Sequence, residues 1–270
     1  MKKHHLINLL KIFILLFLID SCSYPEIIRD EVIYENDFEN NNLSEIDGGG
    51  FTKFNNTTVL GDFNNDGSED IAVGAPGESI GSLTEAGIVH ITQGGFGGWE
   101  NTSSIYQGDS GWPGYTESGD RFGSALTVGD FNSDGFDDLI VGAPGESIGS
   151  RDNAGLIMAA YGSSSGLTDP ENFFQNSPGV RGGSEPGDLF GSSLAAGDLN
   201  GDGYDDVVVG VPGEGIGARN DAGAINILYG SATGLTADSD QFFSQNSPGV
   251  RGGSEPGDLF GSSLAVSDID

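Results

Sequence analysis

Basic side chains are scarce in this sequence. Lys and Arg account for 10 of the 270 residues, against 41 Asp and Glu, and the formal net charge is −31. Proteins that bind nucleic acid need clustered positive charge to meet the phosphates, so this composition excludes nucleic acid as a partner. Hydrophobic residues make up 36% of the chain and fall in short bounded runs, which indicates a folded protein rather than a disordered acidic one.

Histidine is almost absent as well. His90 is the only histidine beyond the first five residues, and a side chain on a strand is its simplest interpretation. No Gly-rich loop leads from a strand into a helix, so the 46 glycines are better explained as turns than as a phosphate cradle. Because no nucleophile–histidine arrangement can recur in the chain, we expect that it is not an enzyme.

Cysteine occurs once, at Cys22, so no internal disulfide is possible. Residues 1–22 begin with a basic stretch and continue with an apolar run over residues 6–19, the pattern of a secretory signal peptide. The run is short for a membrane-spanning helix, and Lys11 interrupts it. Its end, Leu-Ile-Asp-Ser-Cys, resembles a bacterial lipobox, which implies that Cys22 is lipidated and anchors an outer-membrane lipoprotein. An ordinary signal peptide is the alternative, and either interpretation predicts a secreted or cell-surface protein.

A second compositional region follows the signal peptide. Residues 23–50 are acidic, rich in Asn and without apolar periodicity, and they end in Asp-Gly-Gly-Gly. Such a segment cannot bury enough apolar surface to fold by itself. The sequence therefore predicts a flexible acidic linker over these residues.

From residue 51 onward the sequence repeats. Closely similar segments begin at Gly61, Gly129 and Gly197, at a spacing of 68 residues. A fixed period of this length indicates one structural unit per repeat. We expect units over 51–118, 119–186 and 187–256, with the start of a fourth over 257–270.

Short apolar segments recur within each repeat, separated by Gly, Pro, Asn and Asp. In the second repeat they cover residues 122–130, 138–144 and 154–162, with a weaker candidate at 172–176. Four such segments predict a four-stranded antiparallel sheet, and the repeat of that sheet predicts β-propeller blades in an all-β fold. A solenoid of sheets is the alternative.

The number of repeats bears on closure of the ring. Propellers close with about 4–8 blades, so three blades and the start of a fourth predict an incomplete propeller. We expect the chain to be a fragment of a longer protein, with self-assembly of several copies as the alternative route to closure.

Each repeat carries a loop of the pattern D-x-N-x-D-G-x-x-D. Oxygen ligands at positions 1, 3, 5 and 9, a carbonyl at position 7 and a glycine at position 6 suit Ca²⁺, whereas Mg²⁺ prefers to keep several waters. The predicted ligands are Asp62, Asn64, Asp66, Ser68 and Asp70 in the first copy, Asp130, Asn132, Asp134, Phe136 and Asp138 in the second, Asp198, Asn200, Asp202, Tyr204 and Asp206 in the third, and Asp268 and Asp270 in the fourth.

These loops differ from EF-hands. Position 12, where an EF-hand has glutamate, is Val73, Val141 or Val209, and strand-like runs rather than helices flank the loop. The acidic residues at position 8, Glu69, Asp137 and Asp205, are expected to point to solvent. The alternative is an Asx-rich turn that binds no metal. The occurrence of the same pattern at the same place in three repeats argues against this alternative.

Two further motifs keep step with the loops. A Phe-Gly element precedes the second and third loops and recurs before the fourth, at Phe122-Gly123, Phe190-Gly191 and Phe260-Gly261. A Gly-Ala-Pro element follows the first and second loops, at residues 74–76 and 142–144, and the third copy has Gly210-Val211-Pro212 instead. The first copy has Phe54-Asn55 where Phe-Gly is expected.

The combination of motifs over residues 51–270 resembles the FG-GAP repeat of integrin alpha-subunit propellers. The resemblance implies calcium at the loops between the first two strands of each blade, and a function in adhesion or protein recognition. A glycan ligand is the alternative, for which Trp99, Trp112, Tyr106 and Tyr115 could supply stacking surfaces, although they occur in one repeat only. An accessory propeller of a larger secreted enzyme is the third possibility.

Overall fold

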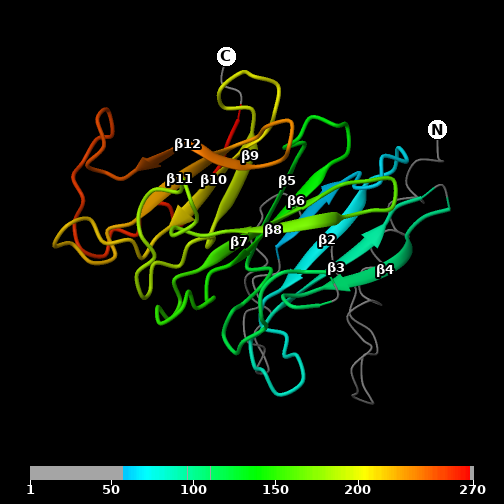
Figure 1. Ribbon diagram of the computed structural model, residues 1–270, viewed down its shortest axis with the longest axis horizontal. Coiled ribbons are helices and arrows are strands. Elements are labelled where there is room, and N and C mark those ends of the chain that lie inside the picture. The colour runs from blue at the N-terminus through cyan, green and yellow to red at the C-terminus, as the bar shows by residue number, and fades with distance from the viewer. Residues whose placement is uncertain (1–56, 96, 110, 268–270) are drawn as a thin grey trace, which may run out of the picture. The chain divides into compact units, whose positions relative to one another are not determined.

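The computed structural model describes residues 57–95, 97–109 and 111–267, which all belong to one compact unit over residues 51–270 (Figure 1). Within these ranges the chain contains twelve strands and no helix, and none of it could cross a membrane as a helix. The strands are β1 Thr58–Gly61, β2 Asp70–Ala75, β3 Ile88–Gln93, β4 Glu100–Ile105, β5 Ala125–Gly129, β6 Asp138–Ala143, β7 Leu156–Tyr161, β8 Thr168–Phe173, β9 Leu194–Gly197, β10 Asp206–Val211, β11 Ala224–Tyr229 and β12 Thr236–Phe243.

The strands form three four-stranded antiparallel sheets, each built from consecutive strands in chain order. The first strands of neighbouring sheets, β1, β5 and β9, contact one another in that order. This arrangement confirms the all-β prediction and is that of successive propeller blades. The sheet of β5–β8 lies between the other two.

The fourth strand of the middle sheet begins earlier than the sequence predicts. The apolar segment at 172–176 suggested its place, but β8 covers Thr168–Phe173 and has polar residues over most of its length. Its pairing with β7 shifts register between Ala159 and Tyr161, as at a β-bulge. Pro170 is tolerated because β8 is the outer edge of its sheet, where a missing N–H leaves no ladder bond unmade.

Burial differs between the sheets. Every residue of β6, β7 and β10 is buried, whereas buried and half-buried residues alternate along β2 and β11. Two hydrophobic clusters lie on either side of the middle sheet, one around Phe63, Leu139 and Met158 and one around Phe131, Ile140 and Leu228. The middle sheet is therefore covered on both faces, which explains the almost wholly apolar sequence of β7.

Glycines bring neighbouring sheets into backbone contact at the two motifs. A Cβ atom added to Gly74 or to Gly142 would lie 2.1 Å from the carbonyl oxygen of Gly123 or Gly191, in the Phe-Gly element between that sheet and the next. The phenylalanine before each of these carbonyls, Phe122 or Phe190, is fully buried. The glycine of Gly-Ala-Pro is thus required by close approach, and the Phe-Gly element closes the junction between blades.

A buried Gln–Glu pair also spans each junction. Gln107 donates to Glu146 at 2.7 Å, and Gln175 donates to Glu214 at 2.5 Å. Burial raises the pKa of Glu146 and of Glu214 to about 7, and the hydrogen bond from glutamine opposes this. The carboxylates of Asp120 and Glu117 face Glu146, and those of Asp188 and Glu185 face Glu214, which raises both pKa values further.

These two pairs predict a pH dependence of stability. A carboxyl with a raised pKa in the folded state binds protons more tightly when folded, so its stabilising contribution is present at low pH and is lost as the pH rises from 4.5 to about 7. The double substitution Glu146→Gln and Glu214→Gln removes this charge. The melting temperature of this variant should exceed that of the wild type, and the difference should grow as the pH rises from 5 to 8. The corresponding gain in the free energy of unfolding is on the order of 1–3 kcal/mol per site. A difference that is constant with pH would contradict the prediction.

Candidate metal sites

The three aspartate loops connect the first and second strands of the three sheets. In the middle loop the N–H of Asp134 donates to Oδ1 of Asp130 at 3.1 Å and to Oδ1 of Asn132 at 2.9 Å. Gly135 donates to Oδ2 of Asp130 at 2.9 Å, and Phe136 donates to Oδ1 of Asp134 at 3.0 Å. The side-chain oxygens at positions 1, 3 and 5 all accept hydrogen bonds from backbone N–H groups of the same loop. These bonds hold the three side chains on one side of the loop.

The same bonds recur in the other two loops. Asp66 and Asp202 donate to the position 1 and position 3 side chains of their own loops, and the position 6 glycines donate to the position 1 carboxylates. Position 4 has a left-handed backbone in every copy, with φ of 51° at Asn65, 55° at Ser133 and 76° at Gly201. Asn and Gly are well suited to this conformation, although the sequence pattern alone did not mark the position.

The position 9 aspartates are buried at the start of the second strands. Asp138 is fully buried and accepts from Phe131 N at 2.9 Å and from Gly162 N at 2.7 Å, one bond to each carboxylate oxygen. Burial raises its pKa to about 7 against these two bonds, and the charges of Asp134 and Asp130 raise it further. Each carboxylate oxygen keeps a second lone pair, so Asp138 can still face a cation.

The donor set fits a hard divalent cation. Carboxylate, amide and carbonyl oxygens are the ligands of Ca²⁺, and the loops contain no histidine or cysteine. In the described part of the chain no three His, Cys, Asp or Glu side chains stand close enough to hold a metal on their own. A bound cation would therefore rely also on the position 3 amide and on the position 7 carbonyl, of Ser68, Phe136 or Tyr204.

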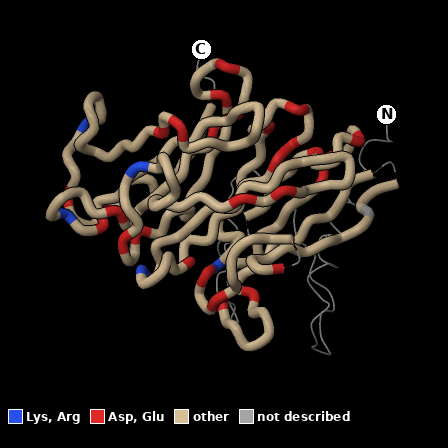
Figure 2. Tube along the Cα trace, in the orientation of Figure 1, with Lys and Arg blue, Asp and Glu red and all other residues tan. Residues whose placement is uncertain are grey.

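The position 8 acids overturn one expectation. Asp137 and Asp205 do not point to solvent: Oδ2 of Asp137 accepts from Asp62 N at 2.8 Å, and Oδ2 of Asp205 accepts from Asp130 N at 2.9 Å. Each acid thus fastens its loop to the backbone of the preceding loop. Glu69, in the first copy, has no preceding sheet in the described residues and is exposed. The three loops form a continuous row along one edge of the blades, where Figure 2 shows acidic residues.

Several predicted features lie outside the described residues. They are the signal peptide with Cys22, the linker over 23–50, Phe54-Asn55, and the fourth-loop residues Asp268 and Asp270. His90 is described: its Nδ1 lies 2.7 Å from Ser104 Oγ on the neighbouring strand, in agreement with a strand position.

The FG-GAP repeat model matches residues 54–92, 122–157 and 190–228. The chain carries three FG-GAP repeats. The phosphatidylinositol-glycan-specific phospholipase D of Mus musculus is 40% identical over 119 residues, which are 44% of this chain and 14% of the relative. Integrin alpha pat-2 of Caenorhabditis briggsae is 34% identical over 196 residues, and integrin alpha-PS5 of Drosophila melanogaster is 32% identical over 164.

These matches show homology to both kinds of protein through the repeat region. The integrin matches cover 66% and 59% of this chain, and 14% and 15% of the relatives. The chain spans about one seventh of the length of the curated relatives it matches, so similarity concerns the FG-GAP repeats and not the whole of either relative.

The loop geometry predicts that calcium stabilises the protein. A cation relieves repulsion among the loop carboxylates, and at ~100-fold excess over its dissociation constant one site adds about 2.7 kcal/mol to the free energy of unfolding. Asp134→Ala should lower the melting temperature in calcium and reduce the bound calcium measured by titration calorimetry by one of three equivalents.

The control is Asp152→Ala, which removes the same charge from an exposed residue outside the loops. It should leave the calcium stoichiometry unchanged. A melting temperature of the wild type that is the same in calcium and in chelator would refute the metal assignment.

Proposed function

We propose that the FG-GAP repeats of this chain form a calcium-binding, non-enzymatic propeller segment that recognises a protein ligand at the cell surface. The observation that carries the proposal is the row of three loops, each with the same oxygen donors and each fastened to its neighbour through Asp137 or Asp205. Calcium in this row would make the blade edges rigid and leave the opposite edge, with its longer connections, as a binding surface.

Protein recognition is favoured over glycan binding by the placement of the aromatic residues. Trp99, Trp112 and Tyr106 are all partly buried, and Trp112 packs against the hydrophobic cluster around Phe63. Tyr115 alone is strongly exposed, at 83%. One exposed ring gives little of the stacking platform that a sugar ligand would need.

The non-enzymatic part of the proposal rests on the side chains within the described repeats. Their buried carboxylates accept from backbone N–H groups or from glutamine, as Asp138 and Glu146 do, and His90 lies beside a serine on an outer strand. The homology to a phospholipase D covers 14% of that relative, so it gives no reason to assign phospholipase activity to this chain.

Ligand binding separates the two kinds of partner. The full chain, saturated with calcium, is applied to an array of extracellular matrix proteins and to a glycan array. We expect binding to a protein that is lost in chelator and restored by calcium. Binding to glycans alone, or protein binding that chelator leaves intact, would contradict the proposed function.

We propose in addition that Cys22 carries a lipid, which would hold the protein on the outer membrane. Radioactive palmitate supplied to expressing cells should label the wild-type chain and should not label Cys22→Ser. Since Cys22 is the only cysteine, the variant leaves no other thiol to acylate. Equal labelling of both forms would rule out the anchor.

A further inference from the structure

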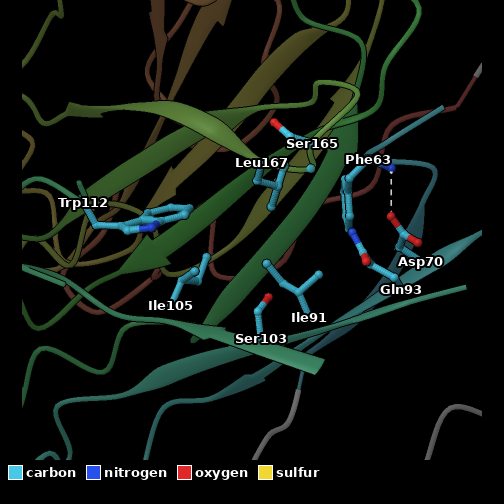
Figure 3. Close-up of a pocket in the computed structure, with 10 residues that line it drawn as sticks. Phe63, Asp70, Ile91, Gln93, Ser103, Ile105, Trp112, Ser165 and Leu167 are labelled. Atoms are coloured by element: carbon cyan, nitrogen blue, oxygen red, sulfur yellow. Dashed lines mark hydrogen bonds between the residues drawn. The ribbon is translucent and has the colours of Figure 1, made fainter. Parts of the chain in front are cut away.

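The three loops carry the same oxygen donors, but they differ in two respects. Behind the first loop, Asp70 lines a pocket of about 150 Å³ together with Gln93 and, from the second repeat, Leu167 (Figure 3). The third loop differs in its own sequence. Its position 4 is Gly201, and the bond from Asn200 to Gly201 is the only Asn-Gly bond in the chain.

An Asn-Gly bond is the sequence in which asparagine deamidates most readily. The backbone nitrogen after the asparagine attacks the side-chain carboxamide, and a following glycine has no Cβ to obstruct the attack. The first and second loops have Asn65 and Ser133 at this place. In the third loop Asn200 and Gly201 are both exposed, and a Cβ added to Gly201 would meet nothing within 4 Å, so the bond lies open to solvent.

Two hydrogen bonds prepare the Asn200 carboxamide and the Gly201 nitrogen for this reaction. Asp202 N donates to Oδ1 of Asn200 at 2.8 Å, which closes an Asx-turn and folds the carboxamide back towards its own following peptide bond. Gly201 N donates to Oδ1 of Asp198 at 2.7 Å. A carboxylate therefore stands at the proton that the attacking nitrogen must lose, and an N–H stands at the oxygen on which negative charge develops.

The first loop has one of these two features. Asp66 N donates to Oδ1 of Asn64 at 2.9 Å, so the Asx-turn is present there. The N–H of Asn65, however, donates to the main-chain carbonyl of Asp62 at 3.3 Å, and a neutral carbonyl is a poor base. The third loop combines the glycine, the Asx-turn and the carboxylate contact.

We propose that Asn200 is a self-modification site, at which the calcium-free loop converts the carboxamide to a carboxylate and the calcium-bound loop does not. Gly201 N forms a bond to Asn200 Cγ while its proton passes to Asp198. The Cγ–Nδ2 bond then breaks, and the leaving nitrogen takes that proton from Asp198 and departs as ammonia. The product is a five-membered succinimide.

Solvent water completes the conversion by adding to either carbonyl carbon of the succinimide. Cleavage of the bond from Cγ to nitrogen gives aspartate, and cleavage at the main-chain carbon gives isoaspartate. Isoaspartate carries its Cβ within the main chain and so lengthens the path from Asp198 to Asp202. This product removes the geometry of the third loop and leaves the first and second loops unchanged.

Protection by calcium rests on the metal sites proposed above. Asp198 and Asn200 are the position 1 and position 3 ligands of the third loop. When their oxygens bind a cation, the Asp198 carboxylate is a weaker base and the carboxamide is held in place. A shortage of calcium would then cost the protein one of its three sites permanently.

The test holds the full chain at neutral pH in chelator or in saturating calcium, followed by tryptic digestion and mass spectrometry. Trypsin releases residues 182–219, in which Asn200 is the only amide side chain, and residues 122–151, in which Asn132 is the only one. In chelator we expect Asn200 to convert roughly tenfold faster than Asn132, which corresponds to a barrier about 1.4 kcal/mol lower. In calcium the rate at Asn200 should fall to that at Asn132.

Two variants separate the contributions. Gly201→Ser copies the middle loop, where Ser133 has φ of 55°, and it should slow the conversion in chelator to the rate at Asn132. Asp198→Asn keeps the glycine and removes the base, so it should also slow the conversion in chelator. Equal rates at Asn200 and Asn132 in wild-type chain without calcium, or an unchanged rate in folded Asp198→Asn, would overturn the inference.

Titration calorimetry on the same samples separates this inference from the calcium assignment. If the chain binds three equivalents of calcium and Asn200 still converts equally fast in calcium and in chelator, protection by calcium is wrong. If the chain binds no calcium, the proposed function fails, and fast conversion at Asn200 relative to Asn132 still supports the modification site.

Discussion

Close approach of backbone to backbone at the blade junctions is the constraint on which the rest of this structure depends. Gly74 and Gly142 leave no room for a side chain against the Phe-Gly carbonyls beside them, so the distance between sheets is fixed at van der Waals contact. Phe122 and Phe190 fill the space next to the contact. At this distance a short aspartate in one loop can reach the backbone of the preceding loop, and a glutamine can reach a glutamate across the junction.

The short distance between neighbouring sheets explains part of the acidic composition of the chain. Many of the carboxylates that the sequence crowds together are acceptors for backbone N–H groups, within a loop at Asp130, at a strand start at Asp138 and between loops at Asp137. Hydrogen bonds to a carboxylate are stronger than those between neutral groups. Two ion pairs are seen between described residues, Arg121–Glu85 and Arg181–Asp240, and neither involves a carboxylate of the three loops.

Local pattern was enough to predict the repeats and the four-stranded sheets, because turn residues and apolar runs specify them within a few residues. The polar edge strand β8 was placed too late, since an outer strand with a proline has no apolar run to mark it. The partners of Asp137 and Glu146 could not be predicted, because they lie in the neighbouring repeat. The pocket beside Gln93 could not be predicted either, because its lining residues come from two neighbouring repeats.

Burial of the middle sheet on both faces has a consequence for how the protein opens. In a linear array each unit gains stability from its neighbours, so a unit with two neighbours is more stable than a unit with one. The backbone amides of β6 and β7 would then exchange with solvent only on global unfolding, whereas those of β2 and β11 would exchange through local opening of an outer sheet. Among the three described sheets, the row of loops would then be most resistant to opening at its middle.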